Sequence, residues 1–216
     1  MFSYWDDHYQ SGGVSGEGSI GDYREWKWKI ITEYCPVINH VIDVGCGDNS
    51  FWQGRECFDY LGIDSSNTII IKNCESRPEW KFINATAELT QKISAPVVFC
   101  MDMLFHIMDD QVYEKIIRNI AEYTEDYLFV YTWQNNPFIN PEIKKYVTRE
   151  YFMKKGYFIK YFQSFFKDIE SDGIYQKYRD FSQYEHIFNE ADLTLIAVEK
   201  YPGDDFGAMY IYKKSS

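Results

Sequence analysis

Between about residues 38 and 132, short runs rich in β-branched residues alternate with segments of helical periodicity. No other feature constrains the fold as strongly, because strands that alternate with helices build a parallel sheet from βαβ units. Five runs are predicted as strands, at residues 41–44, 60–63, 81–83, 97–100 and 127–132. Between the last two lies a helix with one apolar face, capped by Asp109 or Asp110, which predicts a crossover between parallel neighbours.

The pattern changes toward the C-terminus. Ser182 and Glu185 have the spacing of a capping box before a short helix. Two strand-like runs follow, at 193–198 and 208–212, joined by a turn at Pro202 and Gly203. Two strands joined without room for a helix pair antiparallel. The sequence therefore predicts an α/β fold: a mostly parallel seven-stranded sheet with helices on both faces, closed by an antiparallel C-terminal hairpin.

The length favours one domain with added segments. We expect a single domain over residues 1–216, divided into an N-terminal lid and helix (1–37), a ligand-binding core (38–132), an aromatic and basic insertion over the active site (134–181) and a C-terminal helix and hairpin (182–216). The N-terminal helix is predicted from about Asp22, after a loop rich in glycine and serine. Tyr4, Trp5 and His8 are candidates to close over a ligand, and an exposed arm that packs elsewhere is an equal alternative.

The charge balance narrows the choice of ligand. Asp and Glu total 33 against 22 Lys and Arg, a formal net charge of −11. Such a chain disfavours nucleic acid and anionic membranes, but not a cationic or zwitterionic small ligand. The five cysteines have no CxxC spacing, so neither a disulfide framework nor a zinc site is indicated. Without a leader-like N-terminus or a run of 18 apolar residues, we expect a cytoplasmic protein with no membrane partner.

The segment VIDVGCGDNSFW, residues 41–52, carries the strongest local signal. A predicted strand runs into Gly45 and Gly47, where a backbone without Cβ atoms turns tightly and approaches a ligand. Ser50 stands where a dinucleotide motif has its third glycine. The carboxylates of Asp43 and Asp48 would repel a pyrophosphate, whereas they suit an ammonium group.

A second acid lies 21 residues after Asp43, at the end of the next predicted strand. This residue, Asp64, is placed to accept hydrogen bonds from both ribose hydroxyls of a nucleoside. Its alternative role is to cap the following helix, and the two roles are compatible. Together with the glycine turn, it predicts a nucleoside ligand with a positively charged tail.

These motifs resemble those of the class I S-adenosylmethionine-dependent methyltransferases. Residues 43–47, DVGCG, match the family's acidic-x-Gly-x-Gly loop, which contacts the aminoacyl part of the cofactor, and Asp64 matches its ribose acid. Asn49 replaces a glycine that is frequent in the loop, and Asn tolerates positive φ better than most residues. The resemblance covers residues 38–132 and, by topology, the C-terminal hairpin. It implies a Rossmann-like class I methyltransferase fold and S-adenosyl-L-methionine as cofactor, held by Asp43, Gly45, Cys46, Gly47, Asp64, Ser65, Ala85, Thr86 and Met101.

The segment FCMDMLFHI, residues 99–107, resembles the one that follows the family's fourth strand and faces cofactor and substrate. His106 is the candidate base for a hydroxyl acceptor, because imidazole titrates near neutral pH, and a structural histidine is the alternative. Asp102 is a candidate to orient that base or to bind the acceptor. Phe105 stands where many relatives have Glu, which puts metal-assisted chemistry in doubt, and we expect no metal.

Residues 138–181 hold nine Lys or Arg and six acids, interleaved with thirteen Tyr or Phe. Such a segment binds sugars, phosphorylated acceptors or stacked bases, or it is a cover whose lysines lie in solvent. We predict methyl transfer from S-adenosylmethionine to an oxygen of a small-molecule or glycan acceptor. The alternatives are a nucleotide-binding module without methyl transfer, either dehydrogenase-like or a silent regulator, and methylation of RNA or protein. The oligomeric state does not follow from the sequence.

Overall fold

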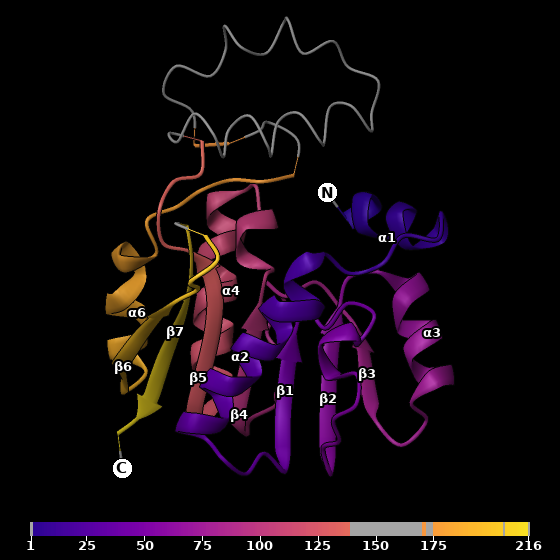
Figure 1. Ribbon diagram of the computed structural model, residues 1–216, viewed down its shortest axis with the longest axis horizontal. Coiled ribbons are helices and arrows are strands. Elements are labelled where there is room, and N and C mark those ends of the chain that lie inside the picture. Colours follow the sequence, from indigo (N-terminus) through magenta and orange to yellow (C-terminus); the bar gives the residue numbers. More distant parts are fainter. Residues whose placement is uncertain (1, 139–169, 172–174, 205, 216) are drawn as a thin grey trace, which may run out of the picture.

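The computed structural model describes residues 2–138, 170–171, 175–204 and 206–215. Seven strands form one sheet in the order β3-β2-β1-β4-β5-β7-β6 (Figure 1). The strands are β1 (His40–Val44), β2 (Asp59–Asp64), β3 (Lys81–Asn84), β4 (Ala95–Met101), β5 (Thr124–Trp133), β6 (Leu193–Lys200) and β7 (Gly207–Lys214). The first five pair in parallel, and β7 pairs antiparallel with β5 and β6. The predicted α/β fold with its antiparallel hairpin is confirmed.

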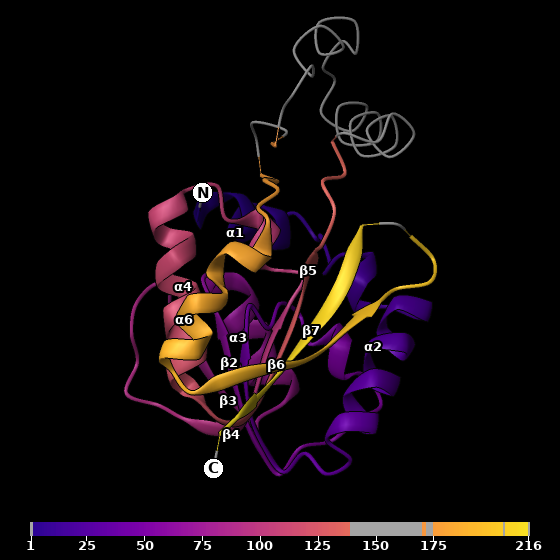
Figure 2. The same cartoon turned by 90° about the vertical axis from the view of Figure 1, so that its left-hand side faces the viewer.

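Alternate residues of the central strands supply two hydrophobic cores, one on each face of the sheet. Along β4, Val98 and Cys100 belong to the core that contains residues of α4 (Asp110–Tyr123) and α6 (Glu185–Glu190). Val97 and Phe99 belong to the core that contains residues of α2 (Gly21–Tyr34). Figure 2 shows α4 and α6 on one side of the sheet and α2 on the other. The remaining helical elements are α1 (Phe2–Gln10), α3 (Asn67–Ser76) and the short 3₁₀ turns η1 (Glu17–Ser19), η2 (Ser50–Trp52), η3 (Leu104–His106) and η5 (Phe181–Tyr184).

One predicted helix cap is confirmed and another is wrong. Asp109 caps α4, since its carboxylate accepts the Val112 N–H at 2.9 Å. At the predicted capping box of Ser182 and Glu185, the carboxylate of Asp180 accepts the Ser182 N–H at 3.1 Å and caps η5. Ser182 therefore already lies inside a turn and cannot cap it, and α6 begins at Glu185 without a side-chain cap. The predicted capping box does not form because Asp180, two residues earlier, is the capping residue.

The strand order reverses between β1 and β4, which are neighbours although the chain forms β2 and β3 between them. In open α/β sheets, ligands bind outside the carboxyl ends of the strands at such a reversal. α1 lies at this end of the sheet (Figure 1). Of the predicted insertion at 134–181, residues 139–169 and 172–174 lie outside the described part of the chain. Among the helices that are described, none has the length and apolar character needed to cross a membrane.

Candidate active site

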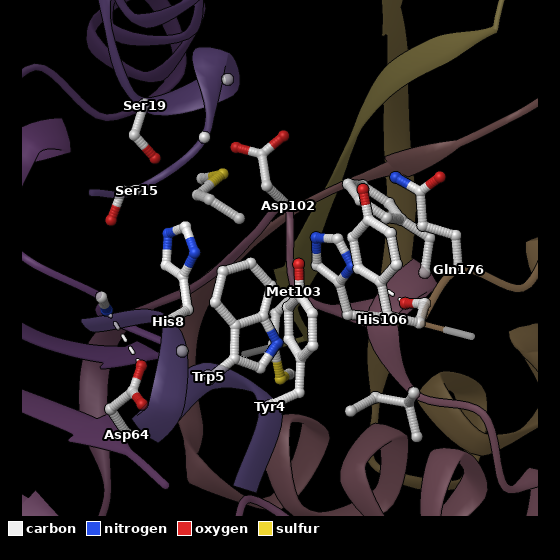
Figure 3. Close-up of a pocket in the computed structure, with 18 of the residues that line it drawn as sticks. Tyr4, Trp5, His8, Ser15, Ser19, Asp64, Asp102, Met103, His106 and Gln176 are labelled. Carbon is white, nitrogen blue, oxygen red and sulfur yellow. Dashed lines mark hydrogen bonds between the residues drawn. The ribbon is translucent and has the colours of Figure 1, made fainter. Parts of the chain in front are cut away.

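A cavity of about 1850 Å³ opens at the strand-order reversal (Figure 3). Its walls come from the carboxyl ends of β1, β2, β4 and β5, from α1 and from residues 11–20. Pockets for one small ligand usually measure about 300–1,000 Å³. This cavity is therefore large enough for two small molecules side by side.

The glycine turn after β1 lies in the cavity wall. Gly45 has φ +81° and Gly47 has φ +52°, a region that disfavours side chains. Space is also restricted there, because a Cβ on Gly45 would lie 2.7 Å from Met103 Cγ and one on Gly47 would lie 2.5 Å from Ser15 Oγ. Asn49 has φ +59°, in keeping with its place in the motif. Backbone conformation and close packing both require the paired glycines.

Asp64 joins the end of β2 to this turn (Figure 3). One carboxylate oxygen accepts the Gly47 N–H at 3.0 Å and the other accepts the Ser66 N–H at 2.9 Å. Each oxygen has two lone pairs, so each can accept one more hydrogen bond. Burial raises the pKa of Asp64. The helix-cap alternative is wrong, since Ser66 caps α3 by accepting the Ile69 N–H.

Asp43 lies elsewhere than the sequence predicts. Strand residues alternate between the two faces, so Asp43 points to the same face as Val41 and into the α2 core. It is 3% exposed, and Trp52 Nε1 and Tyr60 Oη donate to its Oδ2 at 2.9 and 3.0 Å. Burial raises its pKa to about 6. Asp43 therefore does not line the cavity, and its hydrogen bonds with Trp52 and Tyr60 connect β1, the segment after the glycine turn and β2.

Two other predicted cofactor residues also lie outside the cavity lining. The Cys46 side chain is buried against Gly62, where an added Cβ would lie 2.8 Å from the Cys46 Sγ. The Thr86 carbonyl accepts the Leu89 N–H in a turn, and that turn brings Ala87 and Glu88 into the wall instead. The other predicted contacts do line the cavity: Gly45, Gly47, Asp64, Ser65, Ala85 and Met101.

His106 lines the cavity at the end of η3 (Figure 3). Its Nδ1 lies 3.1 Å from the Tyr175 carbonyl oxygen, which can only accept, so Nδ1 carries the proton and Nε2 keeps its lone pair. Its ring lies between Trp5 and Tyr175, at centroid distances of 4.9 and 5.2 Å. Burial lowers the pKa of His106 to about 4, so the imidazole is neutral at pH 7.

Asp102 faces the same cavity, but its ion pair is with Lys27 and not with His106. It has φ +56°, a conformation uncommon outside glycine. Lys27 is fully buried, donates to the Gly18 carbonyl at 2.8 Å and lies 3.8 Å from the centroid of the Tyr131 ring. Sequence reasoning missed Lys27. One sequence signal could have indicated that Lys27 is buried: on a helix it lies on the same face as Ile30 and Ile31, three and four residues later.

The N-terminal arm, residues 2–20, lines the cavity opposite the strand ends. Tyr4, Trp5 and His8 all line the cavity. The Tyr4 ring stacks on Tyr175 at 5.1 Å, and Tyr175 stacks on His106, so rings from α1 reach the candidate base. These contacts place the three candidate lid residues against the site. Within the described part of the chain, no group of three His, Cys, Asp or Glu side chains could hold a metal ion.

No protein-family model and no curated protein sequence matches the chain. Solved structures do. Magnesium protoporphyrin IX methyltransferase from Synechocystis PCC 6803, with bound S-adenosylhomocysteine, has a TM-score of 0.65 at 13% identity over 99% of both chains. The N-methyltransferase NodS from Bradyrhizobium japonicum WM9 has a TM-score of 0.59 at 10% identity, over 90% of this chain and 88% of its own. An S-adenosylmethionine-dependent methyltransferase from Clostridium acetobutylicum has a TM-score of 0.58 at 10% identity, over 100% and 98%. The chain has the fold of the class I S-adenosylmethionine-dependent methyltransferases.

Proposed function

We propose that the chain transfers a methyl group from S-adenosylmethionine to an oxygen of a small molecule or glycan. One observation carries this proposal: the glycine turn, the ribose-type acid Asp64 and the neutral imidazole of His106 line a single cavity. Solved methyltransferases of the same fold support the choice of cofactor: magnesium protoporphyrin IX methyltransferase is solved with S-adenosylmethionine and with S-adenosylhomocysteine, and NodS with S-adenosylhomocysteine.

The residues that line the cavity fit this cofactor. Asp64 has free acceptor capacity for ribose hydroxyls, and Ile63, Ala85 and Met101 offer apolar surface for a flat base. The backbone at Gly45 and Gly47 admits the close approach of an aminoacyl group. When bound there, the cofactor supplies a methyl group already activated on a sulfonium.

The chain itself supplies alignment, exclusion of water and a proton acceptor. Residues 11–20 and the α1 rings border the cavity, and fixed alignment in a shielded site contributes roughly 7 to 11 kcal/mol to such reactions. For a hydroxyl acceptor, His106 Nε2 takes the hydroxyl proton as the oxygen gains its methyl group. Nδ1 keeps its own proton on the Tyr175 carbonyl throughout.

Calorimetry with S-adenosylmethionine, S-adenosylhomocysteine and NAD tests the cofactor. We expect the two S-adenosyl compounds to bind and NAD not to, and Asp64→Asn to weaken binding at least tenfold. Asp59→Asn is the matched control, because it makes the same change at the opposite end of β2, and it should leave affinity unchanged. A preference for NAD would replace the proposal with a dehydrogenase-like module. Cofactor binding without turnover on a panel of hydroxyl acceptors would leave a silent binding module.

A further inference from the structure

The charged Asp, Glu, Lys and Arg side chains that line the cavity in the described part of the chain are all of one sign. Among the described residues that line it, seven are acidic and none is Lys or Arg. The acidic residues are Asp7, Glu17, Asp64, Glu88, Asp102, Asp109 and Asp204. A cavity lined in this way raises the local concentration of cations and lowers that of anions.

Two buried cations that touch lining residues from behind, Lys27 and Arg179, do not change this balance. Arg179 donates to the Ile107 and Met108 carbonyls and pairs with Asp110. Lys27 lies behind the wall, fully buried, and its ammonium group is used by the Asp102 carboxylate, the Gly18 carbonyl and the Tyr131 ring. His106 adds no charge, because burial lowers its pKa to about 4. We call the part of the cavity around Asp102, His106 and Asp204 the acceptor half. An anion there would meet no Lys or Arg side chain among the described residues that line it.

Asp204 adds an unbalanced negative charge beside Asp102. It lies in the turn between β6 and β7, and its hydrogen bonds all come from neutral donors: the Tyr23 hydroxyl at 2.6 Å and the Phe206 and Gly207 N–H groups at 2.9 and 2.7 Å. Burial raises the pKa of Tyr23, so that phenol stays neutral. Lys27, Asp102 and Asp204 together therefore carry a net negative charge.

Aromatic side chains form much of the remaining lining of this half. Tyr4, Trp5, Tyr175 and Trp133 line it, and the Trp133 ring stacks on Phe105 at 4.5 Å. The Tyr131 side chain also lies in the wall, and its buried hydroxyl has no hydrogen-bond partner among the described residues. Aromatic faces bind flat rings and cations.

We infer that the methyl acceptor has no phosphate or carboxylate group and binds by a flat face against these rings. A positive charge on the acceptor strengthens binding. The inference rests on the proposed function, whose acceptor it specifies. Phosphorylated sugars, nucleotides and acidic metabolites fit this lining poorly, because their anionic groups would lose water without gaining a cation from the described residues that form it.

Matched single-ring aromatic compounds test the inference at saturating S-adenosylhomocysteine. Binding of p-cresol, tyramine, 4-hydroxyphenylacetate and phenyl phosphate is measured by ligand-observed NMR, with methyl glucoside as the sugar probe. We expect tyramine and p-cresol to bind at least tenfold more tightly than the two anions. Binding of methyl glucoside in place of the phenols would identify the flat face as that of a sugar. Equal or tighter binding of the anions, or binding of none of the five probes, would overturn the inference.

A charge variant sharpens the test. Asp204→Asn keeps an oxygen for the Phe206 and Gly207 N–H groups and removes one negative charge, so the preference for tyramine over phenyl phosphate should shrink several-fold. Asp59→Asn, far from the cavity, should leave the preference unchanged. An unaltered thermal midpoint and S-adenosylhomocysteine affinity show that the variant is folded. Failure to bind S-adenosylhomocysteine would count against the proposed function, whereas cofactor binding with a preference for anions would count against this inference alone.

Discussion

Asp102 adopts a backbone conformation that few residues other than glycine tolerate, and Lys27 holds its carboxylate in place. Removing one partner of a fully buried ion pair costs about 3 to 5 kcal/mol, but the Asp102 carboxylate is 21% exposed at the cavity and keeps part of its hydration. Lys27→Met should therefore lower the free energy of unfolding by less than that, about 1 to 3 kcal/mol, measured by urea denaturation. The double variant Lys27→Met/Asp102→Asn should recover most of it. Lys81→Met, which breaks an exposed pair with Asp59, should cost less than about 1 kcal/mol.

The shifted pKa of His106 makes a distinct prediction for the pH profile. An imidazole with a pKa of about 4 stays neutral across the physiological range, so the acid limb of the rate profile should lie near pH 4. His106→Asn should reduce methyl transfer by roughly a hundredfold or more and leave cofactor affinity unchanged. An acid limb near pH 6.5 would show that the ring is hydrated in the working enzyme. Equal losses of turnover and affinity would assign the ring a structural role.

Asp43 links stability to pH in the opposite direction from most carboxylates. Its pKa rises from 3.8 to about 6 on folding, so the folded state favours its protonated form. The stability that it contributes is present below pH 3.8 and is lost as the pH rises through about 6. Between pH 4 and 7, the unfolding free energy of the wild type should fall by up to about 3 kcal/mol relative to Asp43→Asn. Asp59, whose pKa Lys81 lowers, is the contrasting control, since Asp59→Asn should give a difference of opposite sign.

At the scale of elements, the N-terminal arm depends on contacts between α1 and α3. Asp6 accepts hydrogen bonds from the Ser66 hydroxyl at 2.8 Å and the Thr68 N–H at 2.9 Å, and Lys72 donates to the Tyr9 carbonyl at 3.0 Å. The Thr68 hydrogen bond is the main cause that lowers the pKa of Asp6, so this anchor persists in mild acid.

Asp6→Asn should weaken the contact between α1 and the N-terminus of α3. We expect amide hydrogen exchange in residues 2–15 to increase at least tenfold, while exchange in β1 and β4 stays unchanged. Asp7→Asn is the matched control, because Asp7 is the next residue of the same helix and its carboxylate is exposed. Equal exchange in the two variants would mean that the aromatic stack on Tyr175 is sufficient to hold the arm.

The strands and the cap of α4 were predictable because their signals are local: short runs rich in β-branched residues and an acid just before a helical stripe. The alternation of strand side chains between the two faces of the sheet places Asp43 in the core, a consequence that the motif match obscures. The partners of Asp6 and Lys27 were not predictable, because Thr68 and Asp102 lie 62 and 75 residues away in the sequence. Such contacts depend on the strand order, which no local pattern contains.

For the molecule as a whole, the sheet order explains why residues so distant in sequence meet. The reversal between β1 and β4 creates a single crevice, and the glycine turn, Asp64 and Asp102 each lie at the end of a strand that borders it. The arm crosses the same edge, where the Ser15 N–H donates to Asp48 at 2.8 Å and Lys27 bonds Gly18. A ligand in the crevice would therefore lie between the arm and the ends of β1, β2, β4 and β5.

A molecule built in this way should be stabilised globally by its cofactor. Binding to the folded state alone adds about 2.7 kcal/mol at a ligand concentration of one hundred times Kd. For a chain of 216 residues, this corresponds to a rise of roughly 5 to 11 °C in Tm, measured by calorimetric melting with S-adenosylhomocysteine. Asp64→Asn, with at least tenfold weaker binding, should lose at least about half of the rise at the same ligand concentration, and Asp59→Asn should keep it. A rise that survives Asp64→Asn would place the nucleoside away from the end of β2 and separate the cofactor from the glycine turn.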